Sequence, residues 1–153
     1  MQNKSMISLF HAALDLYVTT CKPICEKLNM AQPAFDILLF LANNPEYHTA
    51  KDITRFRGIK PNLVSFYVKK MVRDGFLKRE SVPGDRRKVK LLLTPKSEPI
   101  IAEGHMAQEA FFSTLKEGMT EEDIQHFERC ISLLEKNITS AKEKNRKNGV
   151  TEQ

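Results

Sequence analysis

Long apolar runs are missing from this chain of 153 residues. No stretch approaches the roughly 20 consecutive apolar residues that a membrane helix needs. The first ten residues lack a basic segment followed by an apolar core and a small-residue cleavage site, which is the pattern of a secretory signal. Hydrophobic residues (41%) and charged residues (28%) have the proportions of a globular domain. We therefore expect a cytoplasmic protein with no membrane partner, built as one domain with or without dimerising extensions.

Cysteine is scarce, and the three cysteines form no CxxC pair, which argues against a zinc ribbon. In a chain without a secretory signal we expect reduced thiols rather than a disulfide framework. Cys21 and Cys25 lie four residues apart, so a helix would place both on one face. Two interpretations are open: small apolar core residues, or redox-sensing thiols. We expect Cys130 in the core.

Motifs of common catalytic and metal sites are also missing. The sequence has no glycine-rich phosphate loop, no nucleophile elbow and no spaced metal triad. No two of its four histidines have the spacing H-x3-H. A lone histidine on a helix is more often a surface or core residue than a metal ligand. The sequence therefore predicts neither an enzyme nor a metal or cofactor.

Positive charge is concentrated in the middle of the chain. Residues 46–96 contain 14 Lys or Arg and five Asp or Glu, a net charge of +9, whereas the rest of the chain has a net charge of −4. Such local charge suggests a polyanionic partner. Within this segment, "FLKRESVPGDRRKVKLLLT" (residues 76–94) predicts two strands, 76–81 and 88–94, joined by a turn at Pro83-Gly84-Asp85. The basic tip of this hairpin either contacts the partner or is merely solvated.

Apolar spacings of three and four predict helices over 5–28, 32–42, 94–116 and from 120 onward. Pro23 is expected to kink or interrupt the first helix, and the polar end from residue 142 is expected to fray. Thr49 is the expected N-cap of a helix over 50–57 that Gly58 closes. Pro61 opens the next helix, which Gly75 ends. The last helix carries a near-heptad apolar seam of Ile124, Phe127, Ile131, Leu134, Ile138 and Ala141.

Two short helices joined by a tight glycine turn and followed by a basic hairpin predict a winged helix-turn-helix, in a fold that is mainly α with a small β-hairpin wing. A helix fits the major groove of double-stranded DNA, and its N-terminal residues can reach base edges. We expect the helix over 60–74 to do this, while the hairpin tip enters the minor groove. The predicted DNA-binding residues are Lys60, Pro61, Asn62, Ser65, Phe66, Lys69, Lys70 and Arg73 in the helix, and Asp85, Arg86, Arg87 and Lys88 in the hairpin.

The stretches "AQPAFDILLFLANNP", "GIKPNLVSFYVKKMVRDGFLKRE" and "DRRKVKLLLT" resemble the MarR family of bacterial transcription regulators, over roughly Ala31 to Ser97. The start of the second helix, Lys60-Pro61-Asn62, departs from the Ser/Thr-rich start that is common in the family. The resemblance implies a triangular homodimer in which the terminal helices of two chains intertwine and two winged lobes reach consecutive major grooves. It also implies a repressor that responds to small ligands in a cleft between the dimer region and the DNA-binding lobe.

The predicted organisation follows from these segments. Residues 1–31 form an N-terminal dimerisation helix, 32–97 the winged helix-turn-helix, 98–144 the C-terminal dimerisation helices and 145–153 a flexible tail. Tyr17, Phe35, Phe40 and Met106 are candidates for lining the ligand cleft, although at helical spacing they also suit a core.

The predicted function is a sequence-specific, ligand-responsive repressor that binds double-stranded DNA as a homodimer. Two alternatives stay open. One is a redox regulator that senses through Cys21 or Cys25, as the resemblance to peroxide-sensing members of the family implies. The other is a winged-helix module that binds protein rather than DNA, which the net charge of +9 disfavours.

Overall fold

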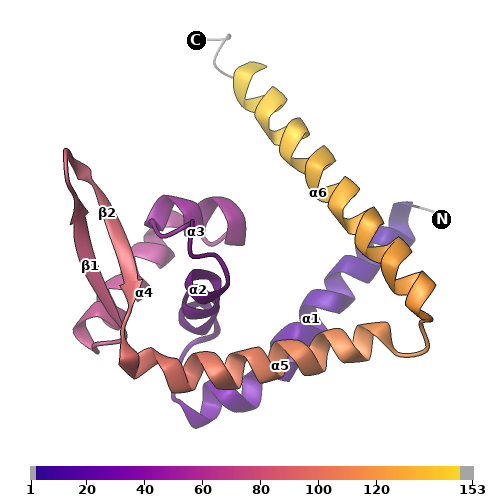
Figure 1. Ribbon diagram of the computed structural model, residues 1–153, viewed down its shortest axis with the longest axis horizontal. Helices are drawn as coiled ribbons and strands as arrows, with labels where there is room; N and C mark the ends of the chain where they lie inside the picture. The colour runs from indigo at the N-terminus through magenta and orange to yellow at the C-terminus, as the bar shows by residue number, and fades with distance from the viewer. Residues whose placement is uncertain (1–2, 149–153) are drawn as a thin grey trace. The chain divides into compact units, whose positions relative to one another are not determined.

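The computed structural model of the chain describes residues 3–148, apart from the side chains of residues 3–4, 86–88 and 146–148. It is mostly helical and contains an antiparallel two-stranded sheet, which confirms the predicted fold class (Figure 1). The chain divides into two compact units, Met1–Phe112 and Ser113–Gln153. The elements are α1 (Asn3–Lys27), α2 (Gln32–Asn43), α3 (Ala50–Arg57), α4 (Pro61–Arg73), β1 (Leu77–Val82), β2 (Asp85–Leu93), a 3-10 turn (Pro95–Ser97), α5 (Glu98–Lys116) and α6 (Glu121–Asn148).

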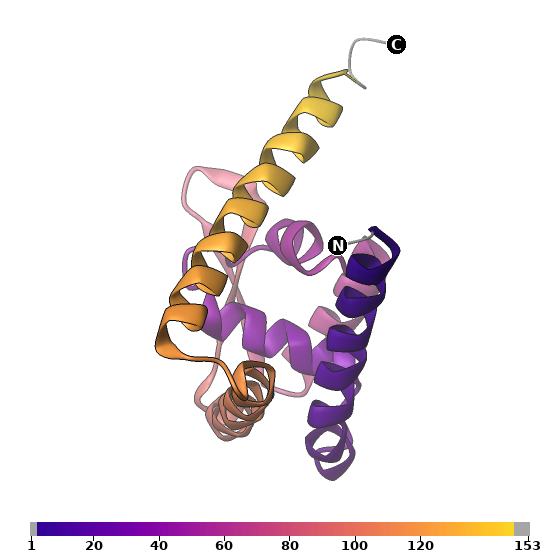
Figure 2. The ribbon, with the colours of Figure 1, turned by 90° about the vertical axis from the view of Figure 1, so that its right-hand side faces the viewer.

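The core of the first unit is built around α2. Seven of its twelve residues are buried: Ala34, Phe35, Ile37, Leu38, Leu39, Phe40 and Leu41. So many consecutive buried residues cannot share one helix face, so the helix must be covered on several sides. Figures 1 and 2 show it between α3 and α5, and it also contacts α1, α4 and β2. Helix α2 is therefore the central helix of the first unit rather than a surface helix.

Gly104 lets α5 approach α2 closely. This glycine is buried, and a Cβ atom built there would lie 2.4 Å from Cδ2 of Leu39. Glycine disfavours a helix interior, yet α5 is continuous from Glu98 to Lys116. The low helix propensity of Gly104 is offset by the close packing of α5 on Leu39, which a larger residue at this position would prevent.

Helix α1 runs without a break through Pro23, so the predicted interruption does not occur. Proline at this position removes the hydrogen bond that the carbonyl of Thr19 would accept. Both residues are exposed or nearly so, and water can satisfy that carbonyl. The free-energy cost of the proline is thus small compared with the stability of the rest of the helix.

The start of α3 is fixed by a reciprocal capping box. Oγ1 of Thr49 accepts a hydrogen bond from the backbone N–H of Asp52 at 3.2 Å, and the Asp52 carboxylate accepts one from the backbone N–H of Thr49 at 3.0 Å. The helix ends at Gly58, whose φ of +65° lies in the left-handed region. Both ends of this eight-residue helix therefore lie where the sequence predicts them.

Replacing Thr49 by alanine should lower the free energy of unfolding by about 1 kcal/mol, the usual effect of losing an N-cap hydroxyl. The measurement is chemical denaturation of the two proteins followed by circular dichroism. Thr49→Ser keeps the hydroxyl and serves as the control, with a loss of less than half that size. Equal stability of wild type and Thr49→Ala would show that the capping box contributes nothing.

The hairpin is regular at its base and irregular toward its tip. Leu77 pairs with Leu93 and Ser81 with Val89, but Val82 pairs with Asp85. The shift leaves residues 86–88 without regular partners, as in a β-bulge. The turn is only Pro83-Gly84, with Gly84 at φ +83°, so β2 begins three residues earlier than predicted. The backbone of the basic triplet 86–88 therefore lies within β2 and not in the turn.

The second unit consists mainly of α6, which Thr120 and Asp123 cap by the same reciprocal bonds as α3. Hydrogen bonds from Thr120 also lower the pKa of Asp123. The helix continues to Asn148, beyond the point where we expected fraying. Cys130 is exposed in the single chain, so the prediction that it lies in the core is wrong. None of the helices in the described part of the chain is long and apolar enough to cross a membrane.

Candidate nucleic-acid interface

Helix α4 buries a narrow apolar stripe and presents most of its polar and basic residues to solvent. Val64, Val68 and Met71 are buried, at spacings of four and three. The remaining positions turn outward, and every helix residue predicted to bind DNA is exposed: Lys60, Pro61, Asn62, Ser65, Phe66, Lys69, Lys70 and Arg73. All eight side chains are therefore accessible to solvent.

The tight connection between α3 and α4 orients this surface. After Gly58, only Ile59 and Lys60 separate the two helices, and Pro61 is the first residue of α4. The fixed φ of proline suits the first helical position, where no N–H donor is needed. The N-terminal turn of α4, with Asn62 exposed, is thus held at the end of a rigid helix pair.

Two aromatic neighbours on α4 have different environments. Phe66 is 60% exposed and contacts Tyr67 edge-to-face, with ring centroids 5.1 Å apart. Tyr67 is partly buried against the core. Phe66 therefore packs against Tyr67 on one side and leaves most of its ring accessible to solvent.

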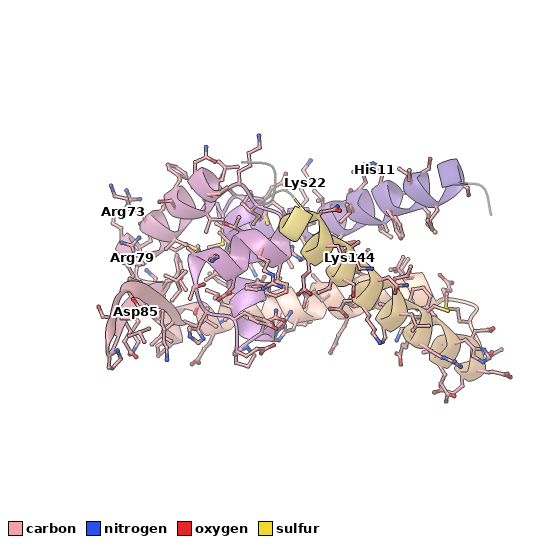
Figure 3. The ribbon with its side chains drawn as sticks, turned by 90° about the horizontal axis from the view of Figure 1, so that it is seen from above. His11, Lys22, Arg73, Arg79, Asp85 and Lys144 are labelled. Atoms are coloured by element: carbon pink, nitrogen blue, oxygen red, sulfur yellow. The ribbon has the colours of Figure 1, made fainter. Side chains whose placement is uncertain are left out.

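The hairpin adds positive charge next to α4. Figure 3 labels Arg73 of α4, Arg79 of β1 and Asp85 of β2 at the same end of the first unit. Arg79 is exposed, and Arg73 donates from Nε to the carboxylate of Asp74 at 3.0 Å. Asp85 is partly buried. The side chains predicted to form the basic tip, Arg86, Arg87 and Lys88, lie outside the described residues.

A hollow of about 460 Å³ lies between α3, α4 and the hairpin. Its lining includes three polar residues that the sequence analysis did not predict as functional: Lys51, Thr54 and Arg79. The available signals were weak, namely the place of Arg79 in the basic hairpin stretch and of Lys51 two residues after the N-cap. The full lining is Ala50, Lys51, Thr54, Pro61, Ser65, Val68, Arg79, Val89 and Leu91.

A second cavity, of about 420 Å³, is lined by α1, the end of α3 and α5. Of the four predicted cleft residues only Tyr17 lines it. Phe35 and Phe40 belong to the core, and Met106, at 69% exposure, points away into solvent. The residues that do line the cavity are Phe10, Ala13, Leu14, Tyr17, Arg57, Gln108, Phe111 and Phe112.

Asp36 of α2 connects the polar groups beside this cavity. Its Oδ1 accepts hydrogen bonds from the Tyr17 hydroxyl at 3.2 Å and from Nε2 of Gln32 at 3.0 Å. The Arg57 guanidinium also lies 3.2 Å from Oδ1. Burial and the Asp36 carboxylate raise the pKa of Tyr17 well above its usual range, so Tyr17 is a neutral donor at physiological pH.

The two cysteines of α1 are packed in the core. Cys21 is fully buried and Cys25 is 7% exposed, and Sγ of Cys25 donates to Oε1 of Gln32 at 3.4 Å. Burial raises the pKa of both thiols, that of Cys25 to about 11. Because the thiolate is the reactive form, this environment favours the core interpretation over the redox interpretation.

Thiol labelling at pH 7.5 should therefore modify Cys130 well before Cys21 and Cys25, by on the order of 100-fold in rate, since the buried pair is shielded and protonated. The raised pKa values also predict that labelling of the pair accelerates as the pH rises toward 11. Mass spectrometry of peptides labelled with iodoacetamide measures the three rates. Fast labelling of Cys21 or Cys25, together with a loss of DNA binding in peroxide that Cys21→Ser or Cys25→Ser prevents, would support redox sensing instead.

The histidine, cysteine and carboxylate residues that the structure describes do not gather into metal sites. Among the described residues, no group of three or more is placed to hold a metal ion. His105 and Glu103 lie on α5, but Glu103 accepts a hydrogen bond from Nζ of Lys27 at 2.8 Å. Nε2 of His105 lies 2.8 Å from Oδ1 of Asn43, so both side chains have structural partners.

Comparison with known proteins identifies a family for the middle of the chain. A family model described as the MarR family matches residues 28–88. No curated protein sequence matches the chain.

Solved structures share the fold over nearly the whole chain. A MarR-family transcriptional regulator from Listeria monocytogenes, complexed with a 26-mer DNA, is 16% identical with a TM-score of 0.76, over 89% of each chain. A MarR-family regulator from Silicibacter pomeroyi is 17% identical with a TM-score of 0.74, over 85% of this chain and 87% of its own. Staphylococcus aureus MarR, complexed with salicylate and kanamycin, is 18% identical with a TM-score of 0.71, over 90% of this chain and 92% of its own.

Proposed function

We propose that this chain, whose residues 28–88 match the model of the MarR family, is a repressor that binds a specific double-stranded DNA site in the bacterial cytoplasm. The observation that carries the proposal is the exposed face of α4, where Asn62 and Ser65 stand among Lys60, Lys69 and Lys70. Amide and hydroxyl groups hydrogen-bond base edges, while lysines neutralise phosphates. A helix with this face fits the major groove.

The hairpin would hold the neighbouring DNA backbone. Lys78 and Arg79 of β1 are exposed, and the basic triplet 86–88 follows the turn in β2. We propose that Arg86 and Arg87 enter the minor groove, where the negative potential is strong, with Lys88 beside them. Asp85 would then orient the tip rather than face a phosphate.

The DNA-binding form is proposed to be a homodimer. The apolar seam of α6 is exposed in the single chain: Phe127, Ile131, Leu134 and Ile138 are each at least 41% exposed. One chain leaves this seam uncovered, and a second copy would bury it in a coiled-coil-like contact. Sedimentation at micromolar concentration should give a dimer, and a monomer would contradict this part of the proposal.

An aromatic carboxylate is the proposed effector class. The cavity between α1, α3 and α5 has aromatic walls from Phe10, Tyr17 and Phe111, and its polar groups include the guanidinium of Arg57 and the amide of Gln108. An aromatic ring with a carboxylate matches both features. The salicylate complex of Staphylococcus aureus MarR supports the same class. Binding there would shift the dimer toward a form that no longer fits DNA.

The test is a competition experiment with DNA from upstream of the gene that encodes the chain. We expect this DNA to bind on the order of 10³-fold more tightly than a random duplex of equal length, as specific regulators do. Salicylate should release the specific complex. Equal affinity for both duplexes would refute sequence-specific recognition, and binding indifferent to salicylate would refute only the effector class.

A further inference from the structure

Asp36 lies beside the cavity and contacts two of the polar groups that line it. Its Oδ1 atom holds three donors, and two of them, Tyr17 and Arg57, also line the cavity. The third donor is Nε2 of Gln32, on the first turn of α2. The Asp36 side chain is 16% exposed and that of Arg57 is 35% exposed. The protein's own carboxylate therefore binds the same cation and hydroxyl that a bound carboxylate would use.

We propose that Asp36 is an internal competitor of the effector and thereby determines which charge the cavity accepts. This inference rests on the effector cavity of the proposed function. In the free protein the Asp36 carboxylate neutralises Arg57 and orients the Tyr17 hydroxyl. An aromatic carboxylate that enters the cavity must take Arg57 from Asp36, whereas a neutral aromatic molecule fills the same apolar walls without doing so.

The chemistry of the guanidinium supports this competition. Arginine carries five N–H donors and prefers two-point contacts with a carboxylate, but Asp36 engages it at one oxygen. A second carboxylate beside Asp36 would repel it, because like charges at close range disfavour each other. A bound anion would therefore compete with Asp36 for the Arg57 guanidinium and the Tyr17 hydroxyl.

The position of Arg57 gives the competition a consequence for DNA binding. It is the last residue of α3, one residue before the Gly58 turn that leads to α4. Through its contacts with Tyr17 and Arg57, Asp36 of α2 thus connects α1 with the end of α3, directly before the turn that orients α4. When Arg57 leaves Asp36, this connection is weakened. Binding of a ligand in the cavity is thereby coupled to the position of α4.

The test compares benzoate with its neutral analogue benzamide by titration calorimetry on wild type and Asp36→Asn. Asparagine can still accept from Tyr17 and Gln32 but carries no charge. We expect Asp36→Asn to bind benzoate on the order of tenfold more tightly than wild type, the size of a typical coupling between sites. Its affinity for benzamide should stay unchanged. Asp15→Asn, an exposed change of the same kind on α1, serves as the matched control and should leave both affinities unchanged.

A second variant covers the case in which Asp36→Asn does not fold. Arg57→Gln should remove the preference for benzoate over benzamide, because it removes the cation that binds either Asp36 or benzoate. Benzoate affinity that is unchanged or weaker in Asp36→Asn, or a benzoate preference that survives Arg57→Gln, would overturn the inference. So would the absence of benzoate binding to wild type and variants alike. DNA binding of the same samples tests the proposed function separately.

Discussion

Replacing Asn62 or Ser65 by alanine will weaken binding to the upstream DNA by about 1–3 kcal/mol each, the usual loss when a base contact is removed. Both side chains are exposed on the N-terminal half of α4, whereas Val64 and Val68 are buried. Because neither side chain is buried, the variants should fold as the wild type does. Fluorescence anisotropy with the upstream duplex and a random duplex gives the two affinities.

The pattern of loss distinguishes base contacts from phosphate contacts. Asn62→Ala should reduce affinity for the upstream DNA and leave the random duplex nearly unaffected. Lys69→Ala should weaken both to a similar degree, because phosphates carry no sequence information. Asn137→Ala, the same change on the exposed surface of α6, is the matched control. Equal losses on both duplexes for Asn62→Ala would remove it from the base-reading set.

Replacing Gly104 by alanine will destabilise the first unit by about 1–3 kcal/mol, the usual cost of overpacking a core. The added Cβ would lie 2.4 Å from Cδ2 and 3.0 Å from Cγ of Leu39. Leu39 is only 2% exposed, so its side chain has little room to move. Chemical denaturation of wild type and variant gives the difference in the free energy of unfolding.

Helix propensity alone makes the opposite prediction, since alanine is favoured over glycine in a helix by about 1 kcal/mol. A Gly104→Ala protein more stable than wild type would therefore show that α5 and α2 do not pack as described. Adding Leu39→Ala should relieve the overlap, so the double variant should lose less than the sum of the two single losses. Glu109→Ala, an exposed change on the same helix, should leave stability nearly unchanged.

Local chemistry made much of the fold predictable. Thr49, Gly58 and Pro61 act on their immediate neighbours, through a cap, a left-handed residue and a fixed φ, and the structure places them as predicted. The predicted interruption at Pro23 does not occur, because its cost depends on whether solvent reaches a carbonyl one turn away. The role of Gly104 was missed because it depends on Leu39, which lies 65 positions earlier in the chain.

The same distinction applies to the sites. The exposed face of α4 followed from periodicity, because fixing the inward positions also fixes the outward ones. The cavity could not be predicted in that way. Tyr17 and Phe35 both lie at helical spacing, but only the contacts between helices place Tyr17 at the cavity and Phe35 in the core. The spacing of Cys21 and Cys25 likewise indicated a shared face without showing that the face is buried.

The most direct test of DNA binding by the α4 face and the hairpin is the affinity for the upstream duplex across a salt series. If α4 and the hairpin contact several phosphates, the logarithm of the association constant will fall linearly with the logarithm of salt concentration. The loss should be on the order of 10³-fold or more between about 50 and 200 mM salt. Lys69→Ala combined with Lys70→Ala should make the slope shallower by nearly two. No binding to the upstream or a random duplex at low salt, or an affinity indifferent to salt, would contradict the account and favour a winged-helix protein that binds other proteins.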